Sequence, residues 1–327
     1  MTDLPSHDPY EEKPNRREIV SRLAATGVAA AAIGGGTLFF HDRRRLEAAA
    51  PEIPDWRVQR SDSAPKGAAA HGADPAANVR RAVAALGGME AFVRKGESVL
   101  IKPNAGWDRL PEQAANTDPK VVAELVRLCR GAGAKRVVVA DLAVNDPVRS
   151  MTRSGLREAA EAAGAEVLDG KSLKLVAASI AGSAAGLEVI DLLFSCQRVI
   201  NVPVAKHHGL SRATVGMKNW FGVLGRGRNR LHQGIDRAVA ELGATFRPTL
   251  TLVDATRVLL GNGPQGGSLS DVKAVNAVLA GTDPVLCDAW GVTQLGLDPA
   301  SLGFITEAEK RGLGRRDLSL LRDLGTA

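Results

Sequence analysis

The chain has 327 residues, of which 45% are hydrophobic and only 4% aromatic, so its core must be built mainly from Ala, Val and Leu. The net charge of +6 and a pI near 9.4 raise the question of a nucleic-acid partner. With one Tyr, few Phe and no recognisable nucleic-acid module, we exclude nucleic acid and expect small anionic ligands instead.

The first fifty residues resemble a targeting segment. The pair Arg16 and Arg17 precedes the uncharged, weakly apolar run Leu23–Phe40. This layout is typical of a twin-arginine signal and predicts export to the periplasm or another extracytoplasmic compartment. The alternative is a membrane anchor, because the run is about long enough to span a bilayer and arginines follow it at 43–45. We expect a signal or anchor with a linker in residues 1–50, and an α/β domain in residues 51–327.

Beyond residue 50, strand-like apolar runs alternate with stretches of helical periodicity. Strands are predicted at 56–60, 98–101, 136–140, 166–168, 187–191, 198–204, 249–253 and 275–280. Helices are predicted at about 74–93, 118–131, 148–163, 213–221, 235–242 and 283–295, with polar helices at the end. This alternation predicts an α/β fold with a mainly parallel sheet and helices on both faces. The length suits one large domain or two closely packed lobes.

Polar side chains recur where the predicted strands end. They are Lys102, Asn104, Asp141, Asn201, Lys206 and Asp254. Ligands of open α/β sheets bind beyond the carboxyl ends of the strands, so we expect these residues to border a binding site. Each one alone would be an ordinary strand-end residue.

The segment 201–234 is the most informative part of the chain. It contains no Asp or Glu, and its basic residues are Lys206, Arg212, Lys218, Arg226, Arg228 and Arg230. It also holds every histidine after His71, namely His207, His208 and His232. Clustered Arg and Lys neutralise carboxylate or phosphate, and neutral imidazoles bind metal ions or move protons. The alternative is a solvated basic loop.

Ordered short stretches resemble the family known as domain of unknown function 362. They are 96–104 (GESVLIKPN), 116–119 (NTDP), 131–134 (GAGA), 205–208 (AKHH), 218–222 (KNWFG) and 281–284 (GTDP), with Asp141, His232 and Asp288. Some members of that family carry ferredoxin-type clusters bound by CxxC runs. This chain has three widely spaced cysteines and no CxxC, so no such cluster is expected.

The layout is more distantly similar to the nickel-pincer lactate racemase family. In that family a His, a later Lys that tethers the cofactor, and another His follow a strand–turn–helix unit. His208, Lys218 and His232 have similar relative positions here. The Gly-rich sequence around that family's Lys is absent, and no His follows the strand that ends at Ala140. The resemblance therefore implies a shared architecture rather than racemisation.

These features predict an exported enzyme, dependent on a metal or cofactor, that acts on a small carboxylate or phosphate. We expect His208, Lys218 and His232 to be catalytic, and His207, His208 and His232 to be the candidate metal ligands. The candidate cofactor-binding residues are Lys102, Asn104, Asp141, Lys206, Arg226, Arg228, Arg230 and Asp254. The cofactor would be a transition metal or a group that contains one. The alternative is a non-catalytic protein that binds an anion or metal outside the cytoplasm.

Overall fold

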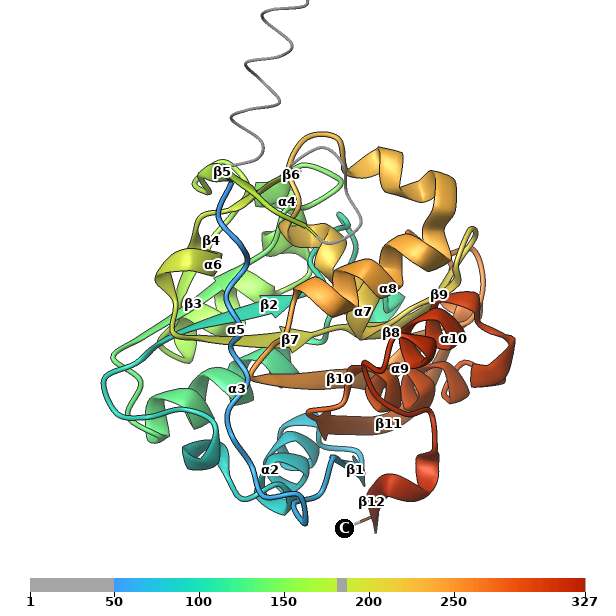
Figure 1. The fold of residues 1–327 in the computed structure, drawn as a ribbon, viewed down its shortest axis with the longest axis horizontal. Coiled ribbons are helices and arrows are strands. Elements are labelled where there is room, and N and C mark those ends of the chain that lie inside the picture. The colour runs from blue at the N-terminus through green and yellow to red at the C-terminus, as the bar shows by residue number, and fades with distance from the viewer. Residues whose placement is uncertain (1–49, 181–186, 327) are drawn as a thin grey trace, which may run out of the picture. The chain divides into compact units, whose positions relative to one another are not determined.

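A large sheet runs through the residues that the computed structural model describes, 50–180 and 187–326 (Figure 1). Its strands are β1 (Gly67–His71), β2 (Ser98–Pro103), β3 (Arg136–Ala140), β4 (Glu166–Leu168), β7 (Arg198–Val202), β8 (Val204–His208), β9 (Arg212–Thr214), β10 (Leu250–Leu259), β11 (Val272–Gly281) and β12 (Leu321–Thr326). The order is β12-β1-β11-β10-β7-β2-β3-β4; β8 follows β7 along β10, and β9 pairs with β8. Along this order only the two pairs made by β11 are antiparallel, which confirms the predicted mainly parallel sheet.

Helices cover both faces of the sheet, as predicted. One face carries α2 (Pro75–Ala85), α3 (Pro119–Gly131), α4 (Pro147–Arg153) and α5 (Leu156–Ala162). The other carries α6 (Leu192–Ser195), α7 (Gly216–Asn219), α8 (Ile235–Thr245), α9 (Pro284–Thr293) and α10 (Gly303–Lys310). Strand alternation explains the two layers: Ile101 packs in the core of α3, whereas its neighbour Leu100 packs in the core of α6 and α8. A separate hairpin pairs β5 (Leu175–Ala178) with β6 (Leu187–Ile190).

Four α-helices of the described residues begin at an Asp-Pro pair. The caps are Asp74, Asp118, Asp146 and Asp283, and each carboxylate accepts a backbone N–H of the first turn. The following proline lacks an N–H, which at that position has no partner inside the helix. The sequence therefore fixes these four helix starts locally.

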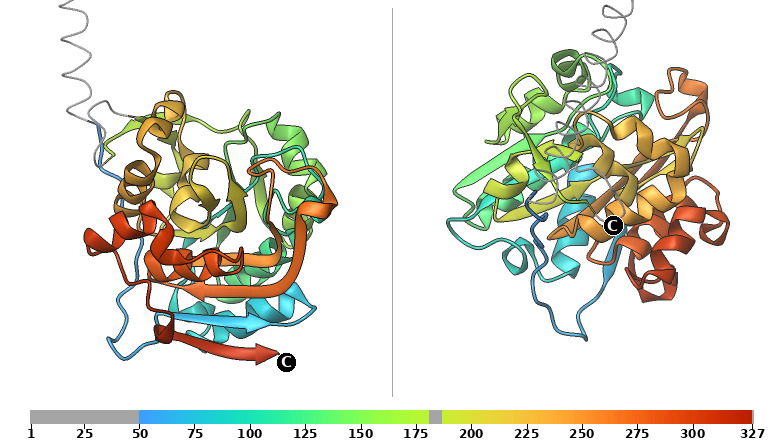
Figure 2. Two further views of the ribbon diagram at one scale, coloured as in Figure 1. Left: turned by 90° about the vertical axis from the view of Figure 1, so that its right-hand side faces the viewer. Right: turned by 45° about the horizontal axis from the view of Figure 1, so that its top comes forward.

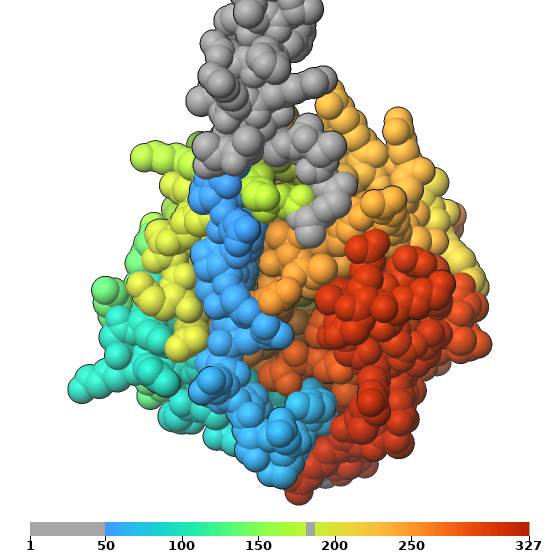
Figure 3. Space-filling view, viewed as in Figure 1, coloured from blue at the N-terminus to red at the C-terminus, as the bar shows by residue number. Residues whose placement is uncertain are grey.

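The sheet differs from the predictions in one strand that does not form and in two strands at one edge that were not predicted. Residues 56–60 form no strand; they belong to an extended strip, residues 51–66, which runs down the surface (Figure 3). There the Trp56 N–H donates to Arg247 O at 3.1 Å. The missed edge is made by β1 and β12, which lie side by side (Figure 2). The Ala-rich β1 and the largely exposed β12 lack the apolar alternation that would have marked them.

Several other boundaries were wrong where a glycine or proline intervenes. The helix expected over 148–163 is divided at Gly155, whose φ is 72°, and the strand expected over 198–204 is divided at Pro203. The helix expected over 74–93 ends at Ala85. In place of a helix over 213–221, β9 is followed by the short α7 and a 3-10 turn, Trp220–Val223.

The predicted signal or anchor lies outside the described residues. From Pro51 to Ala327 the chain forms one compact unit. No helix among the described residues combines the length and apolar composition needed to cross a membrane.

Candidate functional site

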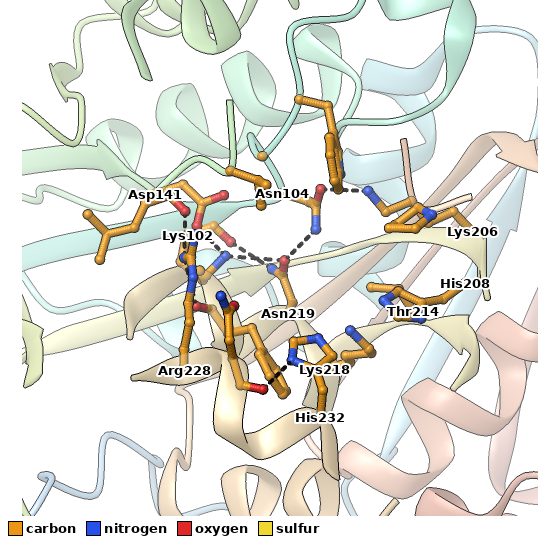
Figure 4. A pocket seen from close by; sticks show the side chains of 18 residues that line it. Lys102, Asn104, Asp141, Lys206, His208, Thr214, Lys218, Asn219, Arg228 and His232 are labelled. Atoms are coloured by element: carbon orange, nitrogen blue, oxygen red, sulfur yellow. Dashed lines mark hydrogen bonds and ion pairs between the residues drawn. The ribbon is translucent and has the colours of Figure 1, made fainter. Parts of the chain in front are cut away.

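A pocket of about 240 Å³ lies beyond the carboxyl ends of β2 and β3, between β8 and the α7 segment (Figure 4). We call it the basic pocket. Its polar lining residues are Lys102, Asn104, Trp107, Asp141, Lys206, His208, Thr214, Lys218, Asn219, Arg228, Asn229 and His232. Eight of the residues predicted from the sequence thus meet in one cavity, at the edge where parallel strands place ligands.

A buried ion pair forms one wall of the pocket. Lys102 Nζ lies 2.7 Å from Asp141 Oδ1, and both side chains are almost fully buried. Asp141 Oδ2 accepts the Ala105 N–H at 2.7 Å. Gly222 faces this pair so closely that a Cβ there would overlap Asp141 Oδ1 and lie 2.7 Å from Lys102 Nζ. Burial lowers the pKa of Lys102, and the charge of Asp141 opposes that shift.

Lys206 is buried in the pocket, and no described carboxylate pairs with it. Its Nζ donates to Asn104 Oδ1 at 2.9 Å and to Ala115 O, and it lies 5.9 Å from the centroid of the Trp107 ring. Burial, and then the charge of Lys218, lower the pKa of Lys206 well below its ordinary value. A bound anion would reverse this shift, because it would stabilise the ammonium form.

Lys218 has no polar partner at all among the described residues. Its Nζ lies over the ring of Phe221, 4.7 Å from the centroid. Burial lowers the pKa of Lys218 to about 8. At neutral pH the amine is therefore a mixture of charged and free forms.

The amide of Asn219 joins the polar residues of the pocket. Its Oδ1 accepts from Lys102 Nζ at 3.2 Å and from Asn104 Nδ2 at 3.0 Å, while its Nδ2 donates to Asn201 Oδ1 at 2.9 Å. Asn201 in turn donates to Gly216 O at 2.9 Å. This network fixes the α7 segment against the ends of β2 and β7, and so positions Lys218.

The start of α7 is held by a second buried group, Asp288 of α9. Its carboxylate accepts the N–H of Gly216 at 2.7 Å and that of Met217 at 3.2 Å. A Cβ on Gly216 would lie 2.7 Å from Asp288 Oδ1, so glycine permits this approach. Burial raises the pKa of Asp288 to about 7.

The two imidazoles of the pocket present opposite hydrogen-bonding groups. Nδ1 of His208 accepts the N–H groups of Leu210 and Ser211, at 3.1 and 3.3 Å, so its proton must be on Nε2. Nδ1 of His232 lies 3.3 Å from the carbonyl of Asn229, to which it can only donate, so its Nε2 carries a lone pair. Burial and the charge of Lys218 lower the pKa of both, to about 3 for His208. His208 is therefore a neutral donor and His232 a neutral acceptor.

The pocket contains much more positive than negative charge. Its lining includes four cationic side chains, Lys102, Lys206, Lys218 and Arg228, but one carboxylate, Asp141. Arg228 donates to the carbonyls of Leu142 and Ala143, at 3.0 and 3.3 Å, and to no carboxylate within residues 50–180 and 187–326. Buried cations without counter-charges are costly, so the arrangement favours an anionic ligand.

Four predicted site residues lie outside the basic pocket. Arg226 and Arg230 are exposed. His207 follows Lys206 on β8 and points to the other side, where its Nδ1 accepts the Gly263 N–H at 3.1 Å. Asp254 is not a strand-end residue, because β10 continues to Leu259. Its carboxylate instead accepts the N–H of Asp118, the cap of α3, at 2.7 Å.

The donor set does not fit a metal ion held by protein side chains alone. His207 is turned away, and Nε2 of His208 carries a proton, which leaves the lone pair of His232. Within the described ranges no group of three or more His, Cys, Asp or Glu side chains is placed to hold a metal. The three-histidine site expected from the sequence therefore does not assemble among the described residues.

Sequence reasoning missed Asn219, Trp107, Thr214 and Phe221 as lining residues. Asn219 and Phe221 stand directly beside Lys218 and Gly222 in the KNWFG stretch, which was the available signal. Thr214 ends β9, a short strand that was not predicted, and the other three do not end a strand, so the strand-end argument could not find them.

Comparison with known proteins identifies the family. The family model described as domain of unknown function (DUF362) matches residues 99–293. This span includes every residue that lines the basic pocket. A relative from Synechocystis, the thylakoid-associated protein sll1697, is 27% identical over 249 residues, which are 72% of this chain and 75% of the relative.

Two solved structures share part of the arrangement. The lactate racemase apoprotein from Thermoanaerobacterium thermosaccharolyticum is 15% identical with a TM-score of 0.42, and the match covers 75% of this chain and 61% of that one. A Thermotoga maritima protein is 11% identical with a TM-score of 0.35, over 73% of this chain and 60% of that one. This chain thus spans about three fifths of either structure.

Proposed function

The chain belongs to the family described as domain of unknown function 362, and from the geometry of the basic pocket we propose that it is an enzyme acting on a small anionic molecule. The observation that carries this proposal is the charge of the pocket. Lys206 and Lys218 are buried without a carboxylate partner in the part of the chain that the structure describes, and a carboxylate or phosphate group would supply the missing charge.

The two imidazoles support an enzyme over a protein that only captures an anion. Binding alone needs donors, and the pocket already has them in its lysines. Nε2 of His232 offers a lone pair and Nε2 of His208 offers a proton, with the ring centroids 6.3 Å apart. Both rings line one pocket, so a ligand there can lose a proton to one imidazole while the other stabilises a developing oxyanion.

Each pocket residue then has a role. Lys206 and the charge of Arg228 attract the anionic group, and Lys218 completes its neutralisation. His232 is the base and His208 the neutral electrophile. The ion pair of Lys102 and Asp141 stabilises the wall of the pocket and takes no part in the reaction.

The test is ligand binding by two variants that remove the same charge. Lys218→Ala, inside the pocket, should weaken binding of phosphate or lactate at least about tenfold, a loss of about 1.4 kcal/mol. Arg226→Ala, on the exposed loop, should bind as the unaltered protein does. Calorimetric titration measures both, and thermal unfolding checks that both remain folded. Equal weakening in the two variants would mean general charge attraction and no specific site.

We also propose that the protein is exported by the twin-arginine route, on the strength of Arg16, Arg17 and the apolar run that follows them. The ligand would then be met outside the cytoplasm.

A further inference from the structure

The three lysines of the basic pocket differ in whether their amine makes a hydrogen bond or an ion pair. Lys102 is ion-paired with Asp141 and also donates to Pro103 O at 2.7 Å. Lys206 donates to Asn104 and to Ala115 O. Among the described residues, only Lys218 of these three has an amine without any hydrogen bond or ion pair, with an aromatic ring as its neighbour. No described residue therefore holds that amine in its charged form.

We propose that Lys218 forms an imine with the carbonyl carbon of a ligand that also carries a carboxylate, that is, a 2-oxo acid. This inference rests on the proposed function, because the same pocket must first bind the anion. It adds the substrate class and the nucleophile.

The surroundings of Lys218 suit this reaction. The Phe221 ring that lies under its Nζ is 5.0 Å from the His232 ring, and His232 is 6.3 Å from His208, measured between ring centroids. The amine and the two imidazoles line the same pocket, and burial together with the charge of Lys218 lowers the pKa of both rings. Figure 4 shows Lys218, His208 and His232 as one group, facing Lys206 and Asn104 across the cavity. The carboxylate of an oxo acid would lie toward Lys206 and leave the carbonyl carbon near Lys218.

The reaction balances with these groups and water. The lone pair of the Lys218 amine attacks the carbonyl carbon, and the C=O π electrons move to oxygen, which the Nε2–H of His208 stabilises. Nε2 of His232 carries two protons in turn from the attacking nitrogen to the oxygen. The first comes from the new ammonium and gives the carbinolamine; the second comes from its remaining N–H, and the oxygen then leaves as water while the C=N bond forms. No oxidant or reductant is involved.

The acidity of Lys218 is consistent with this role. Burial lowers the pKa of Lys218 to about 8, against 10.5 for an ordinary lysine, so at pH 7 its free-amine fraction is larger on the order of a hundredfold. Desolvation is a known way to activate a lysine for carbonyl chemistry.

The experiment is reductive trapping on the full chain. Glyoxylate, pyruvate and 2-oxoglutarate are each incubated with the protein and cyanoborohydride at pH 7, and the adduct is located by peptide mass mapping. We expect at least one of them to modify Lys218 on the order of tenfold more than the exposed Lys310, because burial leaves part of the Lys218 amine uncharged at pH 7. Lys218→Arg keeps a cation but cannot form an imine, so it should lose this adduct. Lys310→Arg, the control, should keep it.

Binding measured in parallel separates the two proposals. If oxo acids and their hydroxy counterparts bind but no oxo acid labels Lys218 preferentially, the imine is refuted and the anion site stands. If neither class binds and no adduct forms, both proposals fail. Labelling that persists with lactate in place of an oxo acid would also refute the imine, because lactate has no carbonyl.

Discussion

Replacing Gly222 by alanine tests whether the wall of the pocket is as tight as the structure shows. The added Cβ would overlap Asp141 Oδ1 and lie 2.7 Å from Lys102 Nζ, in a region where neither charge can reach water. The Gly222 carbonyl also accepts the Leu142 N–H at 2.7 Å, so the two backbones cannot easily separate. The carboxylate must therefore move, and Lys102 loses its counter-charge. Breaking a buried ion pair in this way costs about 3–5 kcal/mol.

The assay is urea unfolding followed by circular dichroism, with Gly209→Ala as the matched control. Gly209 is exposed and has no atom within 4 Å of a built Cβ, so its substitution should change the free energy of unfolding by less than about 0.5 kcal/mol. Asp141→Asn removes the same ion pair without adding volume and should destabilise the protein comparably. A loss below about 1 kcal/mol for Gly222→Ala would refute the reasoning, because it would show that the wall relaxes at little cost.

Three further predictions concern protons and transport. Because the folded pKa of Asp288, about 7, exceeds its unfolded value of 3.8, the folded state holds this proton more tightly. The contribution of this group to the free energy of unfolding should be largest below pH 4. It should fall as the pH rises to 7, by a few kcal/mol at most. Unfolding measured over this pH range should lose that dependence in Asp288→Asn. The ring of His208, with a pKa of about 3, should stay neutral at pH 5 with its proton on Nε2, and nitrogen NMR showing a charged ring there would contradict the assignment. Replacing Arg16 and Arg17 together by Lys should leave the protein in the cytoplasm, whereas normal export in a fractionation assay would exclude the twin-arginine route.

The sequence predicted the parts of the fold that local chemistry determines. The apolar run of β2 and the Asp-Pro start of α3 are specified by neighbouring residues, and both were found. The strands β1 and β12 were missed because their pairing depends on residues far away in the chain. The α7 segment was predicted as part of a longer helix, since its start depends on the carboxylate of Asp288, more than seventy positions later.

The same distinction applies to the candidate site. Strand-end position located Lys102, Asn104 and Asp141 correctly in the pocket. It failed for Asp254, because the length of β10 is set by pairing with β11 rather than by its own composition. Charge clustering marked the segment 201–234 but could not distinguish Arg228, which lines the pocket, from Arg226, which does not. The side chain of Arg228 is directed by its hydrogen bonds to the carbonyls of residues 142 and 143, which lie far away in the chain.

The protons of the two imidazoles are assigned by main-chain atoms. The N–H groups of Leu210 and Ser211 determine one tautomer, and the carbonyl of Asn229 determines the other. Main-chain groups are present whatever side chain a position carries. Substitutions at Asn104, Thr214 or Trp107 can therefore change the size and shape of the cavity while the hydrogen-bonding roles of the two imidazoles stay the same. A pocket with this property can accommodate ligands of other shapes and still present one imidazole donor and one imidazole acceptor.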